Sequence, residues 1–272
     1  MKVFAILIAA LIGLFIGFLL LLYLKQGQLI FAGTEASPLL YKQLNVAEIR
    51  IPVDGAELQG WKHVAPEPDN NIYLIYFGGN AEDVATFFSE FSKLNVAGLF
   101  SFNYRGYALS TGTPSEKVLY QDALHIYDFV KSYDPKAEII VMGRSLGSAV
   151  AGYVGAQRDV VANILITPLK SISALVKEVY PFLPVDIILK HPFFLDHHVR
   201  QLRSPTFVIL AENDEIIPRE HSMSTYEAIP TAKELVELKG ASHNDIFSHP
   251  RFIFSLDRFV NEIIEKQTTA ID

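Results

Sequence analysis

Residues 141–152 read VMGRSLGSAVAG and place Ser145 between two glycines, directly after a run of apolar residues. The run EIIVMG (138–143) is typical of a buried strand, and SLGSAVAGYVGAQ (145–157) is typical of a helix. Ser145 therefore stands at a strand-to-helix turn with the spacing GxSxG. Glycines two residues away on either side let this turn close sharply, which projects the serine hydroxyl above the carboxyl end of the strand. Taken alone, the spacing fits an ordinary glycine-rich turn as well as a nucleophile.

Further apolar runs alternate with amphipathic stretches along the chain. The runs are NIYLIYF (71–77), AGLFSFN (97–103), ANILIT (162–167), TFVILA (206–211) and KELVEL (233–238). The helical candidates are 82–94, 115–133, 146–157, 219–228 and 249–266. Before them, AEIRIPV and AELQGWKHV flank Asp54 and Gly55, which predicts an antiparallel hairpin. Apolar strands separated by helices predict an α/β fold, with a mostly parallel central sheet and helices on both faces.

The N-terminal stretch is the most apolar part of the chain. Val3–Leu24 carries no charge over 22 residues, about 33 Å as a helix, which is enough to cross a hydrocarbon core of about 30 Å. Lys2 and Lys25 bracket it, and Tyr23 stands where an interfacial aromatic would. The run exceeds the apolar region of a signal peptide, about 7–15 residues. We therefore expect a single-pass membrane anchor rather than a cleaved signal peptide or a buried core helix.

This interpretation divides the chain into three parts. They are an anchor (1–25), a linker (26–46) and a catalytic domain (47–268) with a cap at about 168–203. Positive charge flanks the anchor on both sides, and we expect the short N-terminal tail to stay inside and the large domain to lie on the exported side.

Composition excludes several classes of function. A chain of 272 residues, half of them hydrophobic, can bury one sizeable core. The net charge of −7 and the lack of a Lys/Arg block predict no binding to nucleic acid. The absence of cysteine excludes disulfides, thiolate catalysis and Cys-based metal sites. Neighbouring His197 and His198 lack the spacing HExxH, so we expect no metal and no cofactor.

A serine nucleophile needs a base to take its proton and an acid to orient that base. In a strand-to-helix context of this kind, the acid and the histidine follow the serine in that order along the chain. ENDEIIP, after the run at 206–211, supplies Asp214, and KGASHND, after the run at 233–238, supplies His243. Both positions follow strands, where a parallel sheet presents functional groups. The competing carboxylates nearby are Glu212, Glu215 and Asp245.

A second group of candidates would stabilise an oxyanion. The glycine pair Gly78 and Gly79 in IYLIYFGGNAED lets the backbone approach a substrate closely. The backbone N–H of Asn80, or that of Gly79, would then pair with the N–H of Leu146 as oxyanion-hole donors. Without a nucleophile, the same glycines would read as a plain strand-to-helix turn.

These blocks resemble a known family. GRSLG, ENDEIIP and GASHND are similar to the α/β-hydrolase superfamily, and YFGGNAED, NYRGYALSTGTPSE and VYPFLPVDIILKHPF resemble its membrane-anchored serine hydrolases, the abhydrolase-domain branch. The resemblance runs from about residue 47 to the last helix. It implies Ser145 as nucleophile, Asp214 as orienting acid, His243 as base, and Asn80 with Leu146 as oxyanion donors.

The resemblance implies a serine hydrolase that cleaves ester or thioester bonds of substrates with an apolar acyl chain. The apolar segment 168–203 is expected to pack on the core, to line an acyl pocket or to touch the bilayer. The chain departs from the branch at two positions, where Gly78 replaces the usual His and Ala108 the usual Gly. Two alternatives stay open: a catalytically silent domain that binds a lipid or protein partner, and a serine peptidase on the same fold.

Overall fold

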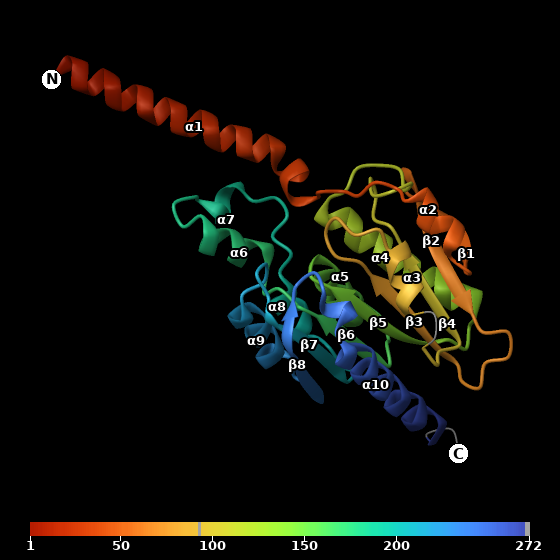
Figure 1. Cartoon of the computed structure of the whole chain (residues 1–272). Helices are drawn as coiled ribbons and strands as arrows, with labels where there is room; N and C mark the ends of the chain where they lie inside the picture. Colours follow the sequence, from red (N-terminus) through yellow and green to blue (C-terminus); the bar gives the residue numbers. More distant parts are fainter. Residues whose placement is uncertain (92–93, 270–272) are drawn as a thin grey trace.

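One eight-stranded sheet forms the centre of the computed structural model, which describes residues 1–91 and 94–269 (Figure 1). The strand order is β1-β2-β4-β3-β5-β6-β7-β8. β1 pairs antiparallel with β2 and β2 with β4, and the remaining neighbours run parallel, so both the hairpin and the mostly parallel sheet are confirmed. The strands are Ala47–Val53 (β1), Ala56–Val64 (β2), Ile72–Phe77 (β3), Gly98–Phe102 (β4), Glu138–Arg144 (β5), Ala162–Ile166 (β6), Thr206–Asn213 (β7) and Lys233–Ser242 (β8).

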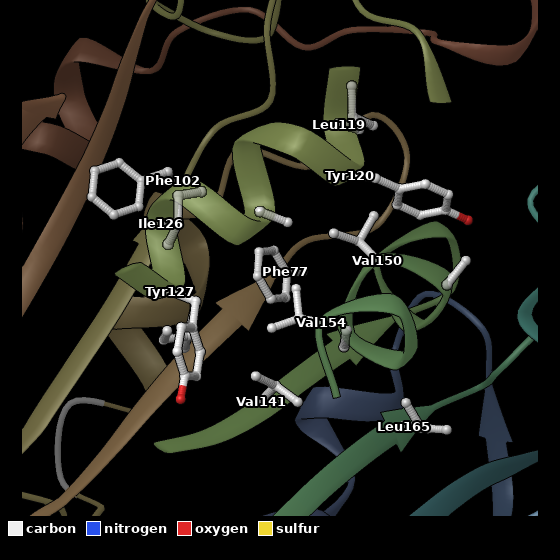
Figure 2. Close-up of a cluster of buried hydrophobic side chains, with 14 of the residues drawn as sticks. Phe77, Phe102, Leu119, Tyr120, Ile126, Tyr127, Val141, Val150, Val154 and Leu165 are labelled. Carbon is white, nitrogen blue, oxygen red and sulfur yellow. The ribbon is translucent and has the colours of Figure 1, made fainter. Parts of the chain in front are cut away.

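Helices cover both faces of the sheet. Alternate residues of β3 point to opposite faces of the sheet. Ile75 and Phe77 join a buried cluster with α4 and α5, part of which is drawn in Figure 2. Leu74 and Tyr76 join a second buried cluster with α3 and α10. The helices are Lys2–Ile30 (α1), Pro38–Gln43 (α2), Ala85–Phe91 (α3), Glu116–Tyr133 (α4), Leu146–Gln157 (α5), Ile172–Val179 (α6), Val185–Ile188 (α7), Leu195–Val199 (α8), Arg219–Ala228 (α9) and Pro250–Thr269 (α10), with a 3₁₀ turn at Ile246–Ser248.

The N-terminal helix is longer than expected. α1 continues through Ile30, into the predicted linker, and α2 occupies another part of that linker. No proline interrupts residues 25–30, and the buried side chain of Gln26 bonds to the backbone of the cap, so the last turns of α1 are held by tertiary contacts. α1 is also long and apolar enough to cross a membrane.

The predicted cap, residues 168–203, has two parts. Leu195 and Val199 of α8 are fully buried against α5. α6 and α7 stand outside the sheet, beside the C-terminal end of α1 (Figure 1). α8 therefore packs in the core, whereas most side chains of α6 and α7 are partly or fully exposed.

The helix expected at 82–94 begins later, at Ala85. The side chain of Asp83 accepts a hydrogen bond from the Ala85 backbone, which favours a turn rather than helix before that residue. Residues 92 and 93 of the expected helix lie outside the described residues.

Candidate active site

Ser145 occupies a sharp turn between β5 and α5. Its backbone has φ 52° and ψ −117°, a conformation that L-residues rarely adopt and that stores strain. A Cβ on Gly143 would lie 2.0 Å from the carbonyl oxygen of Gly147, and a Cβ on Gly147 would lie 2.1 Å from that of Phe77. The backbone passes so close to both glycines that a side chain would not fit at either position, as the GxSxG spacing predicts.

Asp214 and His243 meet at the carboxyl ends of β7 and β8. Nδ1 of His243 lies 2.8 Å from Oδ2 and 2.9 Å from Oδ1 of Asp214. Oδ1 also accepts hydrogen bonds from the backbone N–H groups of Ile216, at 2.9 Å, and Ile217, at 2.7 Å. The two side chains are only 7% and 6% exposed. The carboxylate is therefore fixed by its own loop and, in turn, fixes the orientation of the imidazole.

Ser145 and His243 line one small cavity of about 160 Å³. The remaining lining residues are Gly79, Asn80, Arg144, Ile216 and Asn244. Asp214 lies behind His243, and Leu146 is buried at the first position of α5. The structure thus brings the six residues singled out in the sequence to one end of the sheet.

The two oxyanion candidates on the β3 loop differ in their hydrogen bonding. The N–H of Gly79 donates to Oε2 of Glu82 at 2.8 Å. Within residues 1–91 and 94–269, the backbone N–H groups of Asn80 and Leu146 have no acceptor. The geometry favours Asn80 over Gly79 as the partner of Leu146.

The side chain of Asn80 ties this loop to the segment that follows α1. Its Nδ2 donates to the carbonyl of Ile30 at 2.8 Å, and its Oδ1 accepts from the N–H of Ala32 at 3.1 Å. The same oxygen accepts from the hydroxyl of Tyr107 at 2.6 Å. Burial raises the pKa of Tyr107 to about 12, so this hydroxyl remains a donor at neutral pH.

Glu82 and Arg144 form a second support that sequence reasoning missed. Besides Gly79, Glu82 accepts from the hydroxyl of Tyr76, at 2.7 Å, and from Nη1 of Arg144, at 3.1 Å. Nη2 of Arg144 donates to the carbonyl of His243 at 2.8 Å. One ion pair thereby joins the loop after β3, the turn between β5 and α5, and the loop after β8. Only Arg144, inside GxSxG, stood at a position that the sequence marked, and nothing in the sequence linked it to Glu82.

The departures from the family pattern have local explanations. Ala108 has φ 47°, a left-handed conformation in which glycine is favoured, and its N–H donates to the carbonyl of Thr34 at 2.8 Å. A Cβ on Gly78 would meet Cγ1 of Val84 at 2.9 Å. Valine at 84 thus fills the space beside the glycine. Among the described residues, no group of three His, Asp or Glu side chains is placed to hold a metal ion.

The sequence is similar to curated hydrolases. Alpha/beta hydrolase domain-containing protein aho-3 of Caenorhabditis elegans is 32% identical over 203 residues, which cover 73% of this chain and 60% of the relative. Alpha/beta hydrolase domain-containing protein 17C of Xenopus laevis is 28% identical over 230 residues, covering 81% and 71%. The chain belongs to the α/β-hydrolase superfamily. It spans about three fifths of the length of aho-3, and no family model matches it.

Solved structures show the same α/β-hydrolase fold. The esterase Pf2001 of Pyrococcus furiosus superposes with a TM-score of 0.62 at 17% identity, over 82% of this chain and 91% of that one. Est1E of Butyrivibrio proteoclasticus, with ferulic acid bound, gives 0.64 at 16% identity, over 81% and 99%. The names of these relatives and neighbours support a hydrolase.

Proposed function

We propose that this α/β-hydrolase is a membrane-anchored serine hydrolase that cleaves carboxylic ester or thioester bonds of acyl substrates. The observation that carries the proposal is the joint placement of Ser145, in a strained turn, and His243, bonded to Asp214, on one cavity. α1 supplies the anchor, and the large domain lies on the exported side.

In the proposed reaction, Oγ of Ser145 attacks the carbonyl carbon while Nε2 of His243 takes the hydroxyl proton. Asp214 holds the tautomer that carries a proton on Nδ1 and stabilises the imidazolium. The N–H groups of Asn80 and Leu146 hold the oxyanion of the tetrahedral intermediate. When the tetrahedral intermediate collapses, the alcohol or thiol leaves with the proton from His243. Water then hydrolyses the acyl-enzyme by the same route.

Hydrolysis kinetics test this proposal. Purified full-length protein in detergent is expected to hydrolyse p-nitrophenyl butanoate and a butanoyl thioester. Because the nucleophile and base act as a unit, Ser145→Ala and His243→Ala should each lower kcat by about 10⁴-fold or more, and Asp214→Asn by about 10⁴-fold. Equal activity of wild type and Ser145→Ala would overturn the proposal.

A further inference from the structure

The long N-terminal helix ends against the loop that carries Asn80. α1 ends at Ile30, and the last carbonyl groups of a helix have no partner within the helix itself. The carbonyl of Ile30 accepts a hydrogen bond from Nδ2 of Asn80 at 2.8 Å. Two residues further, the N–H of Ala32 donates to Oδ1 of the same side chain at 3.1 Å. The side chain of Asn80 therefore caps α1 and binds the chain as it leaves the helix.

The same amide oxygen also holds its own loop. Oδ1 of Asn80 accepts from the N–H of Ala81 at 3.1 Å and from the hydroxyl of Tyr107 at 2.6 Å. Ala81 has φ 57°, a conformation that L-residues rarely adopt. Together with the N–H of Ala32, three donors converge on this oxygen. The position of the loop and the position of the end of α1 are thus fixed by one side chain.

The segment that follows α1, residues 31–34, is packed onto the domain. Phe31 is 6% exposed, and its ring centroid lies 5.1 Å from that of His191. The carbonyl of Thr34 accepts a hydrogen bond from the N–H of Ala108 at 2.8 Å. The contact between α1 and the loop of Asn80 therefore belongs to the packing of the domain and not to a loose linker.

The backbone of Asn80 belongs to the proposed reaction centre. Asn80 lines the cavity of Ser145 and His243, and its N–H is the proposed partner of Leu146 in holding the oxyanion. Such a donor acts when it lies within about 2.7–3.1 Å of the oxyanion, so a small displacement of the loop weakens it. Because the oxyanion carries its full charge only after attack, a misplaced donor lowers kcat more than it weakens substrate binding.

We propose that the docked end of α1 is part of the active site: by binding the side chain of Asn80, residues 30–32 aim its backbone N–H at the oxyanion. The side chain of Asn80 is in this sense a positioning group. The inference rests on the proposed function and deepens it, because release of α1 from the domain would lower kcat while Ser145, Asp214 and His243 stay in place. Hydrolysis is thereby coupled to the seating of α1.

The first test removes the side chain of Asn80 and keeps its N–H. For Asn80→Ala, we expect kcat for p-nitrophenyl butanoate to fall about tenfold, with KM close to that of wild type, since the lost hydrogen bonds no longer position the donor. The control is Asn213→Ala, an exposed position at the end of β7 that does not line the cavity, which should keep the wild-type kcat. Wild-type kcat in Asn80→Ala, or equal losses in the two variants, would overturn the proposal.

The second test acts on α1 itself, through Gln26. Its Nε2 donates to the carbonyl of Ile188 at 2.9 Å, and its Oε1 accepts from the N–H of Lys190 at 2.6 Å. Gln26→Leu removes both bonds and is expected to lower kcat about threefold in the wild-type background. In the Asn80→Ala background it should have no further effect, because both changes act through one contact.

The matched control is Gln28→Leu, at an exposed position of the same helix, which should keep the wild-type kcat. A Gln26→Leu enzyme with wild-type kcat would overturn the coupling. The same fold-loss for Gln26→Leu in both backgrounds would also overturn it, since the effect would then bypass Asn80.

A readout without catalysis separates this coupling from the proposed function. Hydrogen exchange of the backbone amides of residues 78–84 is followed by mass spectrometry in full-length Ser145→Ala in detergent. Adding Gln26→Leu should speed exchange in this loop about threefold or more, and adding Gln28→Leu should not. Unchanged exchange with Gln26→Leu would contradict the coupling, even in an active enzyme. A loop that responds in a protein that hydrolyses no ester would contradict only the proposed function.

Discussion

At the scale of single residues, Glu82 connects the loop after β3 to β3 itself and to Arg144 in the turn after β5. Its two carboxylate oxygens accept from the N–H of Gly79, the hydroxyl of Tyr76 and the guanidinium of Arg144. The carboxylate is only 7% exposed, so water does not replace a lost partner. Arg144 also donates a hydrogen bond to the carbonyl of His243, which connects Glu82 to the loop after β8.

We therefore expect Glu82→Gln to lower kcat for ester hydrolysis with little change in KM. Hydrogen bonds to charged groups are worth about 1.5–3 kcal/mol, so losing one predicts a fall of about 10–100-fold. Steady-state kinetics with p-nitrophenyl butanoate measure the effect. The control is Glu237→Gln, which removes the exposed ion pair with Arg219 and should leave kcat unchanged. A Glu82→Gln enzyme with wild-type kcat would show that the network does not position the site.

That Ser145, Asp214 and His243 lie close together was predictable from the sequence, whereas this network was not. GxSxG and two polar loops after apolar runs carry local signals for Ser145, Asp214 and His243. Glu82 and Arg144 are 62 residues apart, and only the folded sheet brings them together. A single carboxylate three residues after a glycine has no pattern that distinguishes it from a solvated side chain.

At the scale of elements, two ion pairs of equal chemistry connect α4 to its surroundings. Arg105, from the loop after β4, binds both oxygens of Asp122 at 2.7 and 2.8 Å, with the side chains 9% and 8% exposed. Arg158, after α5, binds both oxygens of Asp128 at 2.9 and 2.8 Å, but these side chains are 31% and 55% exposed. Arg105 thereby ties the loop after β4 to α4.

Burial decides what each pair contributes to stability. Asp122→Asn should lower the free energy of unfolding by about 3–5 kcal/mol, because it leaves a buried guanidinium without a counter-charge. Asp128→Asn should lower it by only about 0.2–1 kcal/mol. Urea unfolding of both variants in the same detergent measures the difference. Equal losses would contradict the argument.

The contact of α8 with α4 and α5 predicts sensitivity to acid. His198 makes T-shaped contacts with the stacked rings of Tyr120 and Tyr153, with centroid distances of 5.4 and 5.1 Å. Burial, and to a lesser extent the neighbouring His197, lower the pKa of His198. Below a pH of about 6.5, the unfolded chain therefore binds more protons at this residue than the folded chain does.

We expect stability to fall as the pH drops from about 6.5 through the lowered pKa of His198. His198→Phe keeps the ring contacts but cannot titrate, so its free energy of unfolding should depend less on pH across that window. Urea unfolding between pH 7 and 5 measures the slopes. The exposed His125 supplies the control, since His125→Phe should keep the wild-type slope. An unchanged slope in His198→Phe would show that His198 does not cause the effect.

At the scale of the whole molecule, tertiary contacts attach the C-terminal end of α1 to the hydrolase domain (Figure 1). Gln26 bonds to the cap backbone at Ile188 and Lys190, and Phe31 packs against Phe193 with a centroid distance of 6.0 Å. Sequence periodicity could not extend α1 past residue 25, because the contact that holds Gln26 lies 162 residues away.

Breaking this attachment should loosen the helix without unfolding the domain. The chain has no cysteine, so Leu14→Cys and Ser132→Cys provide two unique spin-label sites, on α1 and on α4. We expect a narrow distance distribution by pulsed electron resonance, which Gln26→Leu broadens. Gln28→Leu, at an exposed position two residues along, should preserve it. Equal distributions for the two variants would contradict a fixed position of α1.

The most direct test of the central claim is covalent labelling of the detergent-solubilised protein with a fluorophosphonate, read by intact mass and peptide mapping. A nucleophile assembled with its base attacks the phosphorus, displaces fluoride as the base takes the hydroxyl proton, and keeps one phosphonyl group. We predict one adduct per chain, on the peptide that contains Ser145, absent in Ser145→Ala and preserved in Ser132→Ala. Folded wild-type protein that stays unmodified, or an adduct that persists in Ser145→Ala, would contradict the assignment of Ser145 as nucleophile.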